Sequence, residues 1–179
     1  MKILATVFFC LIASKSFSQV GDEVIVTVDS NLNIRLYDPP KEIRQMGCRI
    51  FSYTKDDIFY QVVVNDSILF NANSKRQFDI SITGMRDGYV NNDLFKGYTV
   101  VDQDSVLDGM PGKFIHIFSA PTNRKIKEVF TFATLQNDHA YTISTIILTD
   151  VDERIKKDVQ YFFKMLHFNG SPYHGFSKK

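Results

Sequence analysis

The sequence has no tryptophan and only two cysteines, Cys10 and Cys48, among its 179 residues. It has no CxxC motif, and its four histidines form no H-x-H or H-x-x-x-H pair. Zinc sites need clustered thiolate and imidazole ligands, so we expect no metal site. We also expect no cofactor, because no motif for one is present.

A strong excess of positive charge is also missing, with 21 Lys and Arg against 20 Asp and Glu. Nucleic-acid binding depends on neutralising phosphates with basic side chains, so nucleic acid is disfavoured as a partner. No segment of the mature chain has the roughly 20 apolar residues of a transmembrane helix, so none is expected there.

The first 18 residues have the pattern of a secretory signal peptide. Lys2 precedes a short apolar stretch, residues 3–13, and Ser16 and Ser18 occupy the small-residue cleavage positions. We predict cleavage after Ser18 and a secreted or periplasmic protein. The alternatives are a buried first element and acylation of Cys10, which the preceding bulky Phe9 disfavours.

Cleavage would leave Cys48 as the one cysteine, so the domain cannot contain an internal disulfide. It would also leave 19 basic and 20 acidic residues, a net charge of −1. We predict a single α+β domain over 19–168 and a loose C-terminal tail over 169–179.

Alternating or β-branched runs predict a sheet-rich fold. Predicted strands cover 22–28, 31–37, 48–54, 58–64, 97–103, 112–120, 126–135 and 140–148. Short connections between them, including a hairpin turn at 55–57, predict antiparallel neighbours. The segment 38–47 is predicted to be a loop, because Pro39 and Pro40 do not suit a sheet interior.

Two helices are predicted. The segment 73–89 alternates in part like a strand, but its longer spacing of apolar residues favours a helix. A second helix runs from Asp150 to His167, with Asp150 and Glu153 as the capping pair and Gly170 beyond its end.

Motifs for catalysis and ion binding are absent or incomplete. The acidic run 102–109 has Val106 and Leu107 where a calcium loop needs an oxygen ligand and glycine, so we predict a strand end and turn. The sequence lacks G-x-S-x-G, and "GMPG" at 109–112 predicts a turn rather than a phosphate-binding loop. No catalytic residue is therefore predicted.

His116 has two interpretations. In a strand it shares one face with Phe114 and Phe118, so we expect a neutral ring buried among aromatics with one ring nitrogen hydrogen-bonded. The alternative is a ligand or general base beside Cys48 or Asp108, as in a thiol enzyme or hydrolase assembled from scattered residues.

The block 73–168 resembles the PsbP/DcrB-like family of small α/β modules. The similarity lies in a helix followed by "FKGYTVVDQDSVLDGMPGKFIHIFS", then the hairpin "EVFTFATLQNDHAYTISTIIL" and the closing helix "DVDERIKKDVQYFFKMLHF". The resemblance implies an α+β fold, an antiparallel sheet of six or more strands flanked by helices in an α/β/α sandwich. It also implies an accessory or partner-binding role without catalysis, with no catalytic residues to transfer.

These observations predict a non-catalytic accessory or binding protein with a protein partner or other ligand. The alternatives are the thiol enzyme or hydrolase above and a structural or assembly component of the cell envelope.

Overall fold

The computed structural model describes residues 24–36, 38–65, 75–122, 124–136 and 139–169. Its elements are, in chain order, β1 (Val24–Thr27), β2 (Leu32–Leu36), β3 (Lys41–Gln45), β4 (Cys48–Lys55), β5 (Ile58–Asn65), α2 (Lys75–Val90), the 3-10 helix η1 (Asp93–Phe95), β6 (Thr99–Leu107), β7 (Met110–Phe118), β8 (Glu128–Gln136), β9 (His139–Ile147), α3 (Glu153–Lys164) and β10 (Leu166–Phe168). The predicted signal peptide and most of the predicted tail lie outside the described residues.

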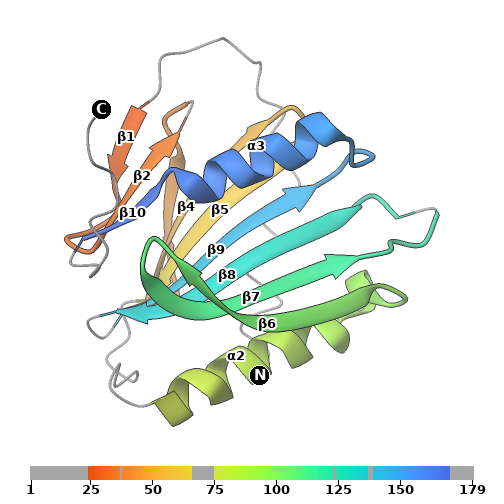
Figure 1. Cartoon of the computed structure of the whole chain (residues 1–179), viewed down its shortest axis with the longest axis horizontal. Coiled ribbons are helices and arrows are strands. Elements are labelled where there is room, and N and C mark those ends of the chain that lie inside the picture. The colour runs from red at the N-terminus through yellow and green to blue at the C-terminus, as the bar shows by residue number, and fades with distance from the viewer. Residues whose placement is uncertain (1–23, 37, 66–74, 123, 137–138, 170–179) are drawn as a thin grey trace.

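A seven-stranded antiparallel sheet dominates the structure (Figure 1). Its strand order is β3-β4-β5-β9-β8-β7-β6, and β1, β2 and β10 form a second, three-stranded antiparallel sheet. The predicted α+β class and the antiparallel sheet of at least six strands are therefore confirmed. Neither described helix is long and apolar enough to cross a bilayer.

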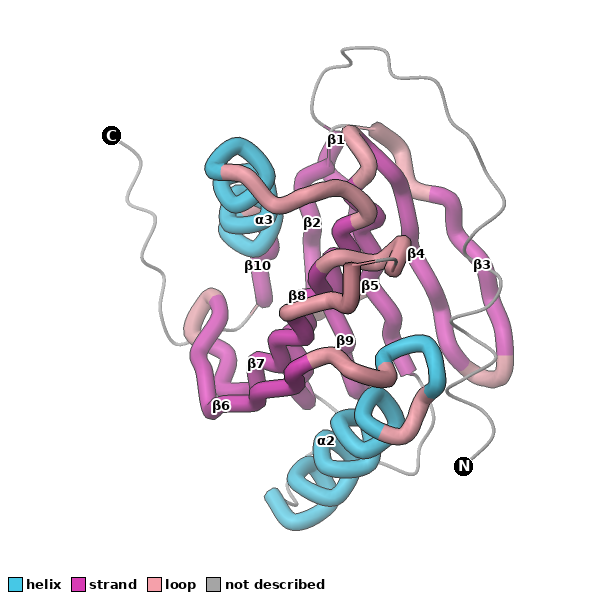
Figure 2. The backbone as a smooth tube through the Cα atoms, turned by 90° about the vertical axis from the view of Figure 1, so that its right-hand side faces the viewer, coloured by secondary structure: helices cyan, strands magenta, loops and turns pink. Residues whose placement is uncertain are grey.

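The two helices pack on different faces of the large sheet (Figures 1 and 2). Ile155, Val159, Phe162 and Phe163 of α3 join one apolar core with side chains of the small sheet and of β4, β5 and β9. Tyr89 of α2 joins a separate core with Ile115 and other side chains of the opposite face. Because the faces alternate along each strand, neighbouring residues of one strand belong to different cores.

The predicted loop 38–47 contains the edge strand β3, which pairs with β4. Both prolines precede this strand, so neither removes a ladder hydrogen bond from it. Ile43 is its one apolar residue, so the strand carried no alternating signal. Met46 and Gly47, both with positive φ, form the turn that follows.

Helix α2 confirms the predicted helix, with Asn73 outside the described residues. The predicted limits of the second helix, Asp150 and His167, are wrong. Asp152, not Asp150, caps α3 by accepting the N–H of Ile155 at 2.8 Å, whereas Asp150 pairs with Lys127. The helix ends at Lys164, and the next residues form β10 and pair with β2.

The turn predicted at 109–112 lies two residues earlier, at 107–110. Asp108 and Gly109, with φ of 48° and 77°, form a two-residue turn, and Met110 already begins β7. Pro111 is tolerated at this strand end, where its carbonyl accepts a hydrogen bond from Thr134 Oγ1. Gly112 is required for space: a Cβ there would lie 2.4 Å from the Ala133 carbonyl oxygen and 2.6 Å from the ring of Phe132.

Candidate functional site

The three groups of the thiol-enzyme hypothesis do not meet. Cys48 begins β4, while Asp108 and His116 belong to the β6–β7 hairpin, and β5, β9 and β8 separate the two parts. Four strand spacings amount to roughly 15–20 Å. Asp108 is instead used structurally, accepting the N–H of Phe168 at 2.7 Å and pairing with His167 at 3.2 Å.

The other histidines are also dispersed. The ring of His139 lies beside that of Tyr141, and His174 is outside the described residues. The described residues contain no group of three or more histidine, cysteine or acidic side chains arranged to hold a metal ion. The acidic run 102–109 forms the end of β6 and its turn, as predicted.

His116 lies in a stack of aromatic rings. Its ring is nearly parallel to those of Phe118 and Phe130, with centroid distances of 4.5 and 4.3 Å. Its Nε2 lies 3.0 Å from a carboxylate oxygen of Glu128. The predicted aromatic packing and the single ring-nitrogen hydrogen bond are confirmed, but the predicted burial is wrong, since 32% of the side chain is exposed.

Strand register explains why these rings meet. His116 is directly opposite Phe130 on β8 and Val101 on β6, and Phe114 is opposite Phe132. Because directly paired residues share a face, the side chains of these five residues all point to the face that carries α3. Helix α3 reaches this part of the sheet through Phe163, whose ring lies 5.5 Å from Phe114.

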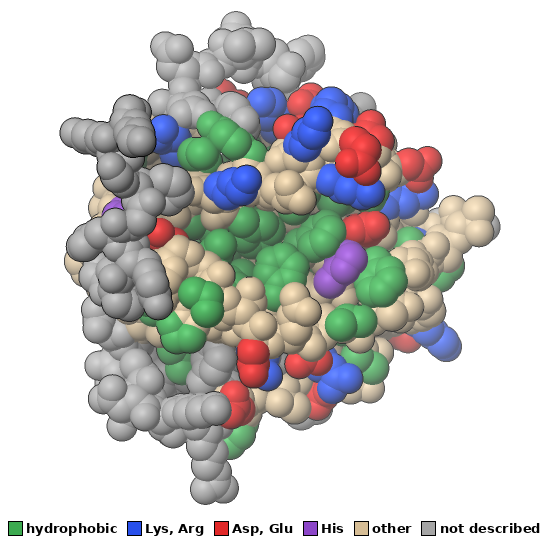
Figure 3. Space-filling view, viewed as in Figure 1, with side chains coloured by type: hydrophobic (Ala, Val, Ile, Leu, Met, Phe, Trp, Pro, Cys, Tyr) green, Lys and Arg blue, Asp and Glu red, His purple; other side chains and the backbone are tan. Residues whose placement is uncertain are grey.

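An aromatic groove results between α3 and the β6–β7 hairpin. We define it by the following residues: Val101, Phe114, His116, Phe118, Phe130 and Phe163. Figure 3 shows apolar side chains gathered in a hollow between α3 and this hairpin. Phe114, Phe118 and Phe130 are half-buried, and Val101 is 46% exposed. A half-exposed aromatic cluster of this kind is typical of a binding surface.

The two walls of the groove differ in charge. On β6 the side chains facing it are uncharged, with Thr99 and Gln103 on either side of Val101. The α3 wall is polar: Lys156 bonds Glu153 at 2.8 Å, which raises the pKa of Lys156, and the nearby charge of Glu128 adds to this shift. The groove therefore has an aromatic floor, one neutral wall and one wall of paired charges.

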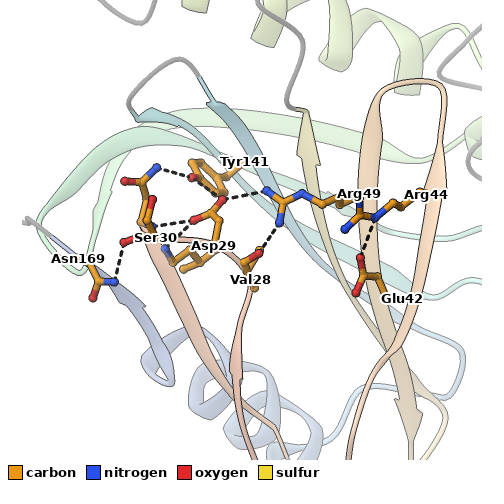
Figure 4. Close-up of polar contacts among 10 residues, drawn as sticks. Val28, Asp29, Ser30, Glu42, Arg44, Arg49, Tyr141 and Asn169 are labelled. Atoms are coloured by element: carbon orange, nitrogen blue, oxygen red, sulfur yellow. Dashed lines mark hydrogen bonds and ion pairs between the residues drawn. The ribbon is translucent and has the colours of Figure 1, made fainter.

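A second polar cluster joins the two sheets (Figure 4). Asp29 accepts hydrogen bonds from the Tyr141 hydroxyl at 2.9 Å and from Arg49 at 3.2 Å, and Arg49 also donates to the Val28 carbonyl. Asn31 donates to the Tyr141 hydroxyl. Burial raises the pKa of Tyr141, so its neutral form is favoured. With its donors and acceptors matched, this cluster fixes the β1–β2 hairpin on the large sheet.

A third polar cluster lies under α2. Ser144 and Thr131 are directly opposite on β9 and β8, and their hydroxyl oxygens lie 3.0 Å apart. The Tyr89 hydroxyl of α2 hydrogen-bonds to both, and burial raises the pKa of Tyr89. This cluster anchors α2 and offers no open surface.

Sequence analysis missed the groove as a site, although it identified His116 and its two phenylalanine neighbours. The alternating pattern of β7 placed these three side chains on one face, but it carried no information on whether α3 would cover them. No protein-family model and no curated protein matches the chain.

Proposed function

We propose that this protein is a secreted or periplasmic, non-catalytic binding protein that holds an apolar segment of a protein partner in the aromatic groove. The half-exposed stack of His116, Phe118 and Phe130 carries this proposal. Aromatic side chains in a hollow bury a large apolar area on binding and lose little side-chain entropy, so they are common at protein interfaces.

Three further observations support it. The signal-peptide pattern of residues 1–18 favours export. Cys48, His116 and Asp108 do not form a common site. The resemblance to the PsbP/DcrB-like family, whose members act as accessory and partner-binding modules, agrees with a groove that binds without reacting.

Two valines of β6 provide a matched test. Val101 is 46% exposed at the groove, and Val106, 64% exposed, points to the opposite face of the same strand. Both sites can accept a glutamate in solvent. We therefore expect Val101→Glu and Val106→Glu to fold alike, and only Val101→Glu to introduce an unpaired charge into the groove.

The mature chain and both variants would be immobilised and exposed to the exported proteins of the native host. We expect a partner retained by wild type and by Val106→Glu to be lost with Val101→Glu. Equal retention by all three would show that the groove is not the binding surface.

Export has its own test. Mass spectrometry of the protein from its native host should give a chain that begins at Gln19 and carries no lipid. A chain that still contains residues 1–18, or an acylated Cys10, would contradict the predicted processing.

A further inference from the structure

Strand β6 is the edge of the large sheet that adjoins the aromatic groove (Figure 1). In the described part of the chain its nine residues pair with β7 on one side and with no strand on the other. An edge of this length presents a row of backbone donors and acceptors that an extended peptide can pair with.

The hairpin turn fixes which residues face outward. Leu107 and Met110 flank the two-residue turn, so they exchange both backbone hydrogen bonds with each other. Alternate residues back along β6 repeat this pattern, down to Thr99. The backbone groups that point away from β7 therefore belong to Val100, Asp102, Asp104 and Val106.

The two faces of this edge have different chemistry. On the groove side, the side chains are Thr99, Val101 and Gln103, all uncharged and exposed. On the opposite side, Asp102 pairs with Arg86 of α2, and Asp104 pairs with Lys113 but leaves 88% of its side chain in solvent. A strand beside β6 would thus meet uncharged side chains and the aromatic groove on one face, and carboxylates on the other.

The opposite edge of the sheet, strand β3, has features that discourage pairing with another strand, and β6 lacks them. Strand β3 has five residues, two prolines precede it, and it carries Lys41 and Arg44, all features that discourage edge pairing. Strand β6 contains no proline and no basic residue. Its aspartates disfavour antiparallel pairing with a second copy centred on Gln103, because Asp102 would then face Asp104. Asp79, Asp102 and Asp104 all lie near Lys113, and with Arg86 as the other basic residue among the described side chains, the acidic side chains remain in excess on this face. That excess favours a basic partner.

We propose that β6 accepts an extended segment of the protein partner as an eighth strand. The segment has apolar side chains on the face turned to the aromatic groove and Lys or Arg on the face turned to Asp102 and Asp104. This inference rests on the proposed function and specifies the conformation and charge of the bound segment.

The test uses synthetic nine-residue peptides, as long as β6. One alternates valine with lysine and the other alternates valine with glutamate. We expect the lysine peptide to bind the mature protein and the glutamate peptide to bind at least about tenfold more weakly, as measured by fluorescence anisotropy. Equal binding of the two, or no binding of the lysine peptide up to about 1 mM, would overturn the proposal.

Amide hydrogen exchange supplies the specific signature of strand addition. Bound lysine peptide should slow exchange about tenfold or more at Val100, Asp102, Asp104 and Val106, whose amides point outward. The amides of the intervening residues, already bonded to β7, should change little. Uniform protection, or protection of groove residues alone, would contradict an added strand.

Val106→Pro removes one outward N–H without touching the groove or the pairing with β7. We expect it to weaken the lysine peptide while leaving the groove intact, and a thermal melt would verify that it folds. If capture of the native partner is lost with Val101→Glu but unchanged with Val106→Pro, strand addition fails and groove binding stands. If neither variant changes capture, both proposals fail. The pattern of amide exchange in the wild-type protein decides whether a strand is added to β6, even if Val106→Pro does not fold.

Discussion

Consecutive residues of β7 differ in how deeply their side chains are buried. Ile115 and Ile117 are fully buried on the face that α2 covers, whereas Phe114, His116 and Phe118 are half-exposed on the face of α3. The two sets have the same spacing, and four of these five residues are apolar. Their difference shows that burial in this sheet is decided by where each helix lies, not by the strand itself.

The α3 face is itself divided. Over β4, β5 and β9 it is sealed by α3 together with the small sheet. Toward β6 and β7 the side chains are half-exposed, and Phe163 of α3 contacts Phe114 there. One continuous face therefore serves as core at one end and as an open groove at the other. Substitutions at the two ends should therefore lower the free energy of unfolding by very different amounts.

Phe162→Ala should have the largest effect. Phe162 is 3% exposed and packs against Tyr60, with ring centroids 4.9 Å apart. Its truncation should lower the free energy of unfolding by about 3–5 kcal/mol, because a cavity opens in the sealed end. The half-buried Phe118→Ala should cost about 1 kcal/mol. Urea denaturation measures both, and similar losses would mean that the two ends are equally packed.

Tyr141→Phe tests what holds the small sheet in place. The loss of its hydroxyl removes hydrogen bonds to Asp29 and from Asn31, and should cost about 1.5–3 kcal/mol because one acceptor is charged. The raised pKa of Tyr141 means that the folded state holds this proton more tightly than the unfolded chain does. Wild-type stability should therefore fall as the pH rises past the ordinary tyrosine value of 10.0.

The variant lacks this tyrosine and should lose less stability than wild type over the same rise in pH. Parallel pH profiles of the two proteins would contradict a raised pKa of Tyr141 in the folded state.

Two glycine-to-alanine substitutions, each adding one methyl group, test how closely different parts of the structure are packed. Gly112→Ala should destabilise by about 1–3 kcal/mol, because the new Cβ meets the Ala133 carbonyl and the Phe132 ring. Gly84→Ala, in α2 with no atom within 4 Å of the new Cβ, should stabilise by about 0.5–1 kcal/mol. Thermal melts of the two variants should shift in opposite directions. A Gly112→Ala protein that melts no lower than wild type would contradict the close packing at β7.

His116→Gln should have a small effect on stability, a loss of about 1 kcal/mol. Glutamine keeps a hydrogen-bond donor for Glu128 but loses two stacked ring contacts. His116→Phe is the matched control, since it keeps the stacking and loses the pairing with Glu128. If the stack is the binding surface, partner capture should fall with His116→Gln and persist with His116→Phe. The reverse order would assign the role to the His116–Glu128 pair instead.

Much of the fold could be predicted because its signals are local. The alternation in β7 and β8, the apolar spacing of α2 and the turn residues between strands each depend on neighbours in sequence. Strand β3 was missed because one isoleucine among charged residues gives no alternation. The capping-box pattern predicts Asp150 as the helix cap because Glu153 follows three residues later. In the structure, Asp152 accepts the N–H of Ile155 instead.

The sequence alone determined the α+β class, the antiparallel hairpins and the shared face of Phe114, His116 and Phe118, since backbone periodicity dictates all three. Tertiary structure alone decided that Glu128 meets His116, that Asp29 meets Tyr141 across 112 positions, and that α3 meets β7 through Phe163 and Phe114. Strand pairing and helix placement depend on the best packing of whole elements, an energy summed over contacts distant in sequence. The groove is the part of the face that this packing leaves uncovered.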